Sequence, residues 1–183
     1  MCMNKKYKII YADPPWQYND NKSWGNAEKY YNTMHIDDIC KLPIQNICDD
    51  DCVLFLWATY PTLPDAFKVI DAWGFTYKTL GFQWIKRNKT GMGYFMGLGH
   101  WTRSNSEPCL IATKGKIKPI RRDVRQLLFY PIGEHSAKPP IIRRKIVELM
   151  GDLPRIELFA RTKTPGWDCW GNEVVNDLEL PSD

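Results

Sequence analysis

Residues 9–16 read Ile9-Ile10-Tyr11-Ala12-Asp13-Pro14-Pro15-Trp16, an apolar run followed at once by an acid, two prolines and a tryptophan. The apolar run predicts a buried strand over 7–12. The four residues after it therefore stand at the carboxyl end of a strand, where open α/β sheets place their ligand sites. Because proline fixes its own φ angle and keeps the preceding residue extended, we expect a stiff turn here.

The residue types in this turn suit the binding of an amine. The Asp13 carboxylate and the proline carbonyls are hydrogen-bond acceptors. Two such acceptors at fixed positions can bind both N–H groups of an exocyclic amine and direct the nitrogen lone pair outward. Trp16 adds a flat face on which a nucleobase can stack. Asp and Pro are also common in ordinary turns, so the motif alone leaves a purely structural turn open.

The composition is typical of a globular protein. The 183 residues are 44% hydrophobic and 25% charged, and we expect one domain over 1–183. The net charge of +4 is compatible with a polyanionic partner but does not require one. No apolar stretch is long enough to span a membrane. The first eight residues do not resemble a signal peptide, so we expect a cytoplasmic protein with reduced thiols.

The six cysteines do not predict a metal site. They stand at 2, 40, 48, 52, 109 and 169. None forms a CxxC pair, and no histidine stands at the spacing of a zinc ligand. We therefore expect no bound metal.

Strand-like and helix-like segments alternate along the chain, which predicts an α/β fold with a mostly parallel sheet. After the first strand, we expect strands over 52–58, 76–85, 108–113, 124–130 and 155–160. We expect helices over 61–73, ended by Gly74, and over 139–150, which starts with two prolines. Residues 19–32 and 87–106 are expected loops. The second is long for a loop in a compact domain, and we expect 91–106 to close over a substrate.

The segment 159–173 leaves the last predicted strand and enters a turn with several glycines. Arg161 and Lys163 in it can bind a carboxylate, and Asn172 and Glu173 can bind a ribose or a base edge. Taken alone, this segment is better explained by a solvated loop.

Two further polar segments are candidates for anion binding. Ser136 and Lys138 come directly before the helix predicted over 139–150, and a helix N-terminus attracts anions. Taken alone, these two residues are better explained by a helix cap. The basic stretch 114–125 can hold phosphates, and 143–145 is a second basic candidate. A solvated charged face explains 143–145 equally well.

In order along the chain, these motifs resemble the family of adenine amino-group methyltransferases named for the seventy-kilodalton catalytic subunit of the eukaryotic messenger-RNA methyltransferase. The resemblance covers nearly the whole chain, and the ordered set is highly specific. The matching stretches are Ala12–Trp16, Leu54–Trp57, Trp73–Phe75, Trp84–Lys86, Gly99–Trp101, Glu107 with Cys109, Lys114–Gly115, Ser136 with Lys138–Pro139, Ile156–Arg161, and Gly166–Trp167 with Gly171–Glu173.

The resemblance implies a Rossmann-like methyltransferase fold in permuted order, with the catalytic motif before the cofactor segment. It implies S-adenosylmethionine as the methyl donor. The implied catalytic residues are Asp13, Pro14, Pro15 and Trp16. The implied cofactor-binding residues are Asp13, Ser136, Lys138, Phe159, Arg161, Thr164, Asn172 and Glu173. On the substrate side we place Trp16, Tyr18, His100, Trp101 and Glu107 around the base, and Lys116, Arg121 and Arg122 on phosphates.

We therefore expect an enzyme that methylates the exocyclic amine of adenine in DNA. A compact chain without long tails looks more like a bacterial or phage enzyme than a eukaryotic RNA-modifying subunit. RNA is the nearest alternative acceptor. Because members of the family can work as pairs, a homodimer or a heterodimer is compatible with the sequence. A non-catalytic nucleic-acid-binding subunit is a further alternative, against which the intact motif at 13–16 argues.

Overall fold

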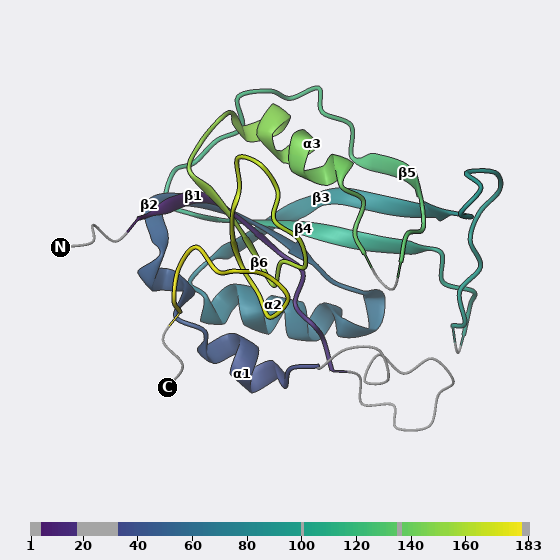
Figure 1. Cartoon of the computed structure of the whole chain (residues 1–183), viewed down its shortest axis with the longest axis horizontal. Helices are drawn as coiled ribbons and strands as arrows, with labels where there is room; N and C mark the ends of the chain where they lie inside the picture. The colour runs from purple at the N-terminus through teal and green to yellow at the C-terminus, as the bar shows by residue number, and fades with distance from the viewer. Residues whose placement is uncertain (1–4, 18–32, 100, 135–136, 181–183) are drawn as a thin grey trace.

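The computed structural model describes residues 5–17, 33–99, 101–134 and 137–180. The strands in it are β1 (Tyr7–Ala12), β2 (Cys48–Trp57), β3 (Thr76–Arg87), β4 (Ser106–Lys114), β5 (Leu127–Pro131), β6 (Arg155–Leu158) and β7 (Asp168–Trp170). The α-helices are α1 (Ile36–Lys41), α2 (Leu63–Ala72) and α3 (Ile141–Met150), and short 3-10 turns occupy Ile44–Asn46 and Tyr60–Thr62. The strands form one sheet in the order β5-β3-β4-β2-β1-β6-β7 (Figure 1).

Most strand pairs in the sheet are parallel, which confirms the expected Rossmann-like α/β fold. β1 pairs in parallel with β2 and β6, β6 with β7, and β3 with β5. β4 runs antiparallel to both of its neighbours, β2 and β3. The carboxyl ends of β1, β2, β3 and β6 therefore meet the amino end of β4 at one edge of the sheet.

The permuted order follows from the pairing of β1 with β6. Ala12 at the end of β1 is the register partner of Leu158 at the end of β6. Asp13 and Phe159, which come next in each strand, therefore leave the sheet side by side. The motif at 13–16 and the segment 159–173 lie at the same edge, although most of the chain separates them in sequence.

Helices cover both faces of the sheet, which explains why its central strands are almost wholly apolar. Alternate side chains of β1 point to opposite faces of the sheet. Ile10 packs in the hydrophobic cluster that includes α1 and α2, and Tyr11 packs in the cluster that includes α3. α2 buries Ala66, Val69 and Ile70 at helical spacing. Figure 1 shows α3 on one side of the sheet and α1 and α2 on the other.

The structure differs from the sequence-based prediction at several element ends. β2 begins at Cys48, four residues early, because Cys48 already pairs with Tyr7 of β1, and the register shifts across the acidic residues 49–51 before Val53 pairs with Ile9. β5 begins at Leu127 instead of 124. α1 and β7 were not predicted, because six and three residues are too short for a periodic pattern.

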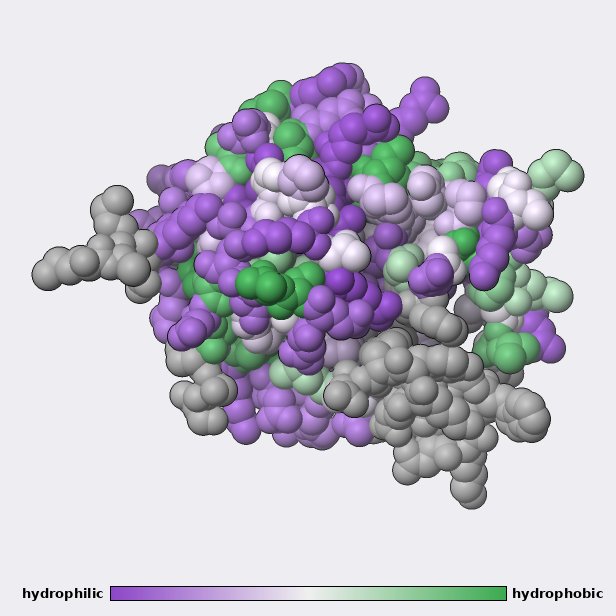
Figure 2. Space-filling view, viewed as in Figure 1, coloured by the Kyte–Doolittle hydropathy of each residue, from purple (hydrophilic) through white to green (hydrophobic). Residues whose placement is uncertain are grey.

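Within the described ranges, no helix is long and apolar enough to cross a membrane. Likewise, no group of three or more His, Cys, Asp or Glu side chains in these ranges is placed to hold a metal ion. The face in Figure 2 is mainly hydrophilic, with apolar residues in separate patches.

Gly171 is required where the chain passes β6 after β7. A Cβ atom at Gly171 would lie 2.3 Å from the carbonyl oxygen of Ala160, whose N–H donates to the Trp170 carbonyl. We predict that Gly171→Ala lowers the free energy of unfolding by about 1–3 kcal/mol, because backbone rather than a flexible side chain must move. Urea unfolding measures this loss.

Gly133→Ala is the matched control for this substitution. Its added Cβ would meet only the Ala137 Cβ, 3.9 Å away. Equal stability of the Gly171→Ala and Gly133→Ala variants would contradict the prediction.

Candidate active site

The turn at the end of β1 is held by hydrogen bonds from its own residues and from the chain after it. The N–H of Trp16 donates to the Pro14 carbonyl, and the N–H of Met34 donates to the Pro15 carbonyl, both at 2.8 Å. The indole N–H of Trp16 donates to the Trp57 carbonyl at 3.1 Å. The expected stiff turn is therefore fixed at three points. Each proline carbonyl keeps one lone pair, because a carbonyl oxygen has two.

Lys138 connects this turn to the middle of the sheet. Its ammonium lies 2.9 and 3.0 Å from the two carboxylate oxygens of Asp13 and 3.3 Å from Oε2 of Glu107. The other Glu107 oxygen, Oε1, pairs with the ammonium of Lys86. Negative and positive groups thus alternate along a chain of four residues. The chain runs from the end of β1, through the segment before α3, to the start of β4 and the end of β3.

This charged chain is largely removed from water. The side chains of Lys138 and Glu107 are 11% and 9% exposed, whereas Asp13 keeps 24% exposure and so presents one face to a ligand. Aromatic rings line the network: the Lys138 ammonium lies 5.6 Å from the Trp57 ring. Loss of one partner in such a buried pair typically costs about 3–5 kcal/mol, because the remaining charge is uncompensated.

The two carboxylates have pKa values shifted in opposite directions. Burial raises the pKa of the Asp13 carboxyl above its ordinary value, although Lys138 opposes this. Burial also acts to raise the pKa of Glu107, but the ammonium groups of Lys138 and Lys86 outweigh it, and the pKa lies below its ordinary value. Burial opposes the charge of Lys138, yet Asp13 and Glu107 together raise its pKa. Lys138 therefore stays a cation at neutral pH.

A second set of polar contacts fixes the floor under the network. The indole N–H of Trp57 donates to the Tyr11 hydroxyl at 2.8 Å. Arg143 of α3 donates two hydrogen bonds to Glu157, at 2.5 and 2.6 Å. Its guanidinium lies 5.8 Å from the Tyr11 ring. These contacts connect α3 to β1 and β6 beneath Asp13.

The segment after β6 carries a strained residue. Phe159 has a φ of 59°, which is unusual for a residue with a Cβ, and its ring lies edge-on to Trp170 at 5.4 Å. Such backbone strain gathers at functional sites. Beyond it, Arg161 faces Glu173 at 3.9 Å, and both side chains are partly exposed. The edge of the sheet thus presents Asp13 beside a polar, open segment.

Comparison with known proteins gives the family. A family model described as MT-A70 matches residues 7–173, which include every part of the site described above. The chain belongs to the MT-A70 family.

Three relatives of this MT-A70 chain come from different organisms. It is 36% identical to the Type II methyltransferase M.MunI of a Mycoplasma species, with 97% of this chain and 82% of the relative aligned. It is 26% identical to an N(6)-adenosine-methyltransferase MT-A70-like protein of Arabidopsis thaliana and 27% identical to the human N(6)-adenine-specific methyltransferase METTL4. The chain spans 24% and 38% of the length of these two. It is a methyltransferase of the MT-A70 family.

The structure brings most of the predicted site residues of this MT-A70 chain to one edge. Asp13, Lys138 and Glu107 are in contact. The predicted cofactor residues in the segment after β6 are Phe159, Arg161, Thr164, Asn172 and Glu173, of which Arg161 and Glu173 face each other. The predicted residues Tyr18, His100 and Ser136 lie outside the described residues. Trp101, predicted to contact substrate, is fully exposed.

The prediction that Trp16 offers its face to a base is not met. The side chain is 6% exposed and packs in the core with α1 and α2. Its indole N–H is bound to the Trp57 carbonyl, so the ring anchors the turn instead of lining an open surface. A short local motif does not reveal on which side of the strand an aromatic residue packs.

The structure places Lys116, Arg121 and Arg122 away from the Asp13 turn, and their contact with substrate phosphates stays a prediction. β4 is antiparallel to β2, with Cys52 paired to Lys114, so the segment after β4 lies at the opposite edge of the sheet. The nine residues of β4 separate the two edges by about 27 Å. There, the Lys116 N–H donates to Asp51 at 2.6 Å, and the Arg121 side chain pairs with acidic groups of the same region.

Sequence reasoning gave no role to Lys86, Trp57 or Tyr11. Lys86 and Trp57 stand inside stretches that match the family, Trp84–Lys86 and Leu54–Trp57. Their contacts with Glu107 and Lys138 depend on the pairing of β3, β4 and β2, which a linear pattern does not give. The signal that was available is a charged residue directly after an apolar strand.

We predict that Glu107→Gln destabilises the fold at neutral pH and that the loss shrinks in acid. The folded-state pKa of Glu107 lies below its ordinary value of 4.5, so its carboxylate stabilises the fold above that pH and this stability is lost as the pH falls below it. Urea unfolding at several pH values measures the difference between the two proteins.

Glu148→Gln on the exposed side of α3 is the control and should track the unmodified protein at every pH. A Glu107→Gln deficit that is constant from neutral to acid pH would show that the ionised carboxylate does not carry the effect.

Proposed function

We propose that this protein transfers a methyl group from S-adenosylmethionine to the exocyclic amine of adenine in DNA. The observation that carries the proposal is the Asp13 carboxylate, held by Lys138 at 2.9 Å beside two proline carbonyls in an anchored turn. An amine with two N–H groups is the ligand that such an arrangement of acceptors fits. Membership of the MT-A70 family supports the proposal.

The residues at this edge fit S-adenosylmethionine. The donor carries a carboxylate, an ammonium and a ribose, which require a cation, an anion and hydrogen-bonding groups. Lys138 and Arg161 are the cations, and Asp13 is the anion. Glu107 Oε2 is buried, and its one partner among the described residues is the Lys138 ammonium at 3.3 Å, so it can accept a further N–H. Asn172 and Glu173 are exposed and can meet a ribose.

When bound, the cofactor supplies an electrophilic methyl group on a positively charged sulfur. Asp13 and a proline carbonyl accept the two N–H groups of the adenine amine, which frees the nitrogen lone pair from the ring system. The anchored turn fixes the direction of that lone pair, and such alignment can lower a barrier by about 7–11 kcal/mol. As the C–N bond forms, the bond between the methyl carbon and sulfur would break and leave a neutral thioether, and the Asp13 carboxylate would stabilise the positive charge that grows on nitrogen.

Asp13 also takes part in removing the surplus proton. Because burial raises its pKa, the carboxyl is a better proton acceptor than a solvent-exposed aspartate. Lys138 keeps the carboxylate in place while it accepts the proton. The step needs no covalent intermediate on the protein.

DNA is proposed as the acceptor on the basis of one relative. M.MunI is named a Type II methyltransferase, and the alignment with it covers 82% of that protein. The relatives named as adenosine methyltransferases are longer and match over about a quarter of their length. In duplex DNA the adenine must leave the base stack to reach Asp13, at a cost of a few kcal/mol.

The acceptor is tested by incubating the protein with labelled S-adenosylmethionine and matched DNA and RNA pools, followed by nucleoside mass spectrometry. We expect methylated adenine from DNA. Methylated adenosine from RNA alone would reassign the acceptor. Absence of transfer to both pools by the intact protein, with the cofactor bound, would overturn the enzymatic proposal.

We predict that Asp13→Asn abolishes methyl transfer in a protein that stays folded at neutral pH, with a lower free energy of unfolding because Lys138 loses one of its two buried anionic partners. Because burial raises the pKa of Asp13, its ionised form is disfavoured in the fold, and we expect the stability loss to be smaller than that of Glu107→Gln. Transfer assays and urea unfolding measure the two effects.

Asp65→Asn, at an exposed ion pair on α2, is the matched control and should leave transfer unchanged. Retained transfer by Asp13→Asn would remove Asp13 from the reaction. Unfolding together with loss of transfer would make Asp13 a structural residue.

A further inference from the structure

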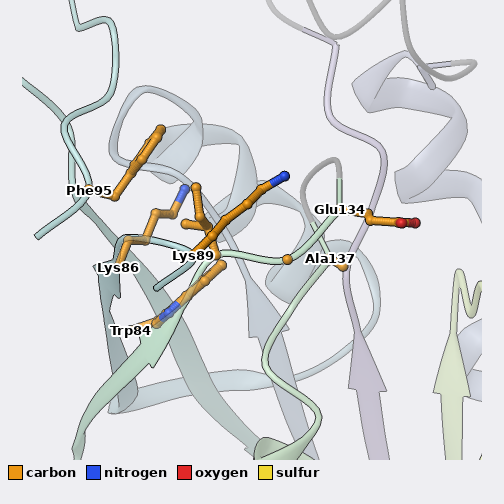
Figure 3. Close-up of a pocket in the computed structure, with 8 residues that line it drawn as sticks. Trp84, Lys86, Lys89, Phe95, Glu134 and Ala137 are labelled. Atoms are coloured by element: carbon orange, nitrogen blue, oxygen red, sulfur yellow. The ribbon is translucent and has the colours of Figure 1, made fainter. Parts of the chain in front are cut away.

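A cavity of about 650 Å³ opens beside the charged network. It is lined by Trp84, Lys86, Lys89, Phe95, Ile132, Gly133, Glu134 and Ala137. Figure 3 shows Phe95 and Lys86 on the side of β3, and Glu134 and Ala137 on the opposite side. This volume lies within the range of small-ligand sites.

The cavity is connected to the proposed reaction site through shared residues. Lys86 lines the cavity and pairs with Glu107, which in turn contacts Lys138. Ala137 is the neighbour of Lys138 in the chain. β4 and β2 stand between β3 and β1, so β3 lies about 14 Å from the strand that carries Asp13. A base with its amine on Asp13 therefore leaves the cavity free, and the adjoining part of the same strand can reach it.

The walls of the cavity offer a ring and a cation. Phe95 is half-buried, and its N–H donates to the Lys86 carbonyl at 3.0 Å, which holds the segment after β3 against the strand end. Asn88 donates to the Met92 carbonyl and closes the turn between them. Lys89 is exposed and forms no ion pair within the described part of the chain. Trp84 forms the base of the cavity, with the Lys86 ammonium 5.0 Å from its ring.

A ring on one wall and an unpaired ammonium near it match the chemistry of a nucleotide. Bases stack on aromatic side chains with little dependence on sequence, and ammonium groups pair with phosphates. The cavity differs in this from the Asp13 turn, which has acceptors but no open aromatic face.

We propose that this cavity binds the nucleotide next to the acceptor adenine, with its base against Phe95 and its phosphate on Lys89. The proposal rests on the proposed function for the identity of the adjoining base. It gives the protein a second contact with the strand, which holds the substrate while the adenine lies on Asp13.

Binding of fluorescein-labelled single strands, measured by anisotropy, tests the proposal. The probes are a short oligo-dA strand and an abasic strand of the same length and charge. We expect Phe95→Leu to weaken oligo-dA binding about tenfold and to leave abasic binding unchanged, because only stacking is lost. We expect Lys89→Ala to weaken both, and to reduce the slope of log affinity against log salt by about 0.7.

Matched controls are available on the same chain. Phe67→Leu removes a partly exposed ring on α2, and Lys78→Ala removes an exposed ammonium on β3 far from the cavity. Both should bind the two probes as the unmodified protein does. Equal losses in cavity and control variants, or unmodified oligo-dA affinity in Phe95→Leu, would overturn the proposal.

Failure of the cavity proposal is separable from failure of the proposed function. The anisotropy measurement needs no methyl transfer, and transfer by the unmodified protein is measured independently. Normal transfer with cavity variants that bind like the controls would leave the enzyme in place and remove the nucleotide site. Binding that depends on the cavity residues, without methyl transfer, would support the nucleotide site and remove the enzymatic proposal.

Discussion

The ammonium of Lys138 lies between two carboxylates from different strands, 2.9 Å from Asp13 and 3.3 Å from Glu107. A buried cation of this kind is stable only with both anions present, and each anion is stable there only with the cation. The end of β1, the start of β4 and the segment before α3 must therefore come together for any of the three groups to be buried. This interaction fixes the position of Asp13, on which the proposed chemistry depends.

The direction of β4 makes this arrangement possible. Because β4 runs against its neighbours, its first residues lie at the edge where β1, β2 and β3 end. Glu107, the second residue of β4, is thereby placed opposite Trp84 on β3, two residues before Lys86. If β4 ran parallel to its neighbours, its last residues would lie at this edge instead of its first. The basic segment after Lys114 would then stand beside Asp13 in place of Glu107. The same reversal sends Lys116 and Arg121 to the far edge.

Much of the fold followed from local patterns, while part of the site did not. The strand at 7–12 was predictable because an apolar run is unambiguous, and the position of Asp13 at its end follows directly. The burial of Trp16 and the location of Lys116 were not predictable, because each depends on pairings between strands. The cavity at Phe95 was hidden for a related reason: its walls come from two loops that meet only in the folded chain. The roles of the cofactor residues at 159–173 stay predictions.

The nitrogen that receives the methyl group gives the most direct test of this account. DNA that contains adenine labelled with ¹⁵N only at the exocyclic amine would be incubated with the protein and S-adenosylmethionine, and the methylated nucleoside analysed by mass spectrometry and NMR. If Asp13 and a proline carbonyl direct the amine lone pair to the methyl group, the methyl is bonded to ¹⁵N from the first turnover. A methyl on a ring nitrogen, or on an unlabelled amine formed by rearrangement, would contradict the account.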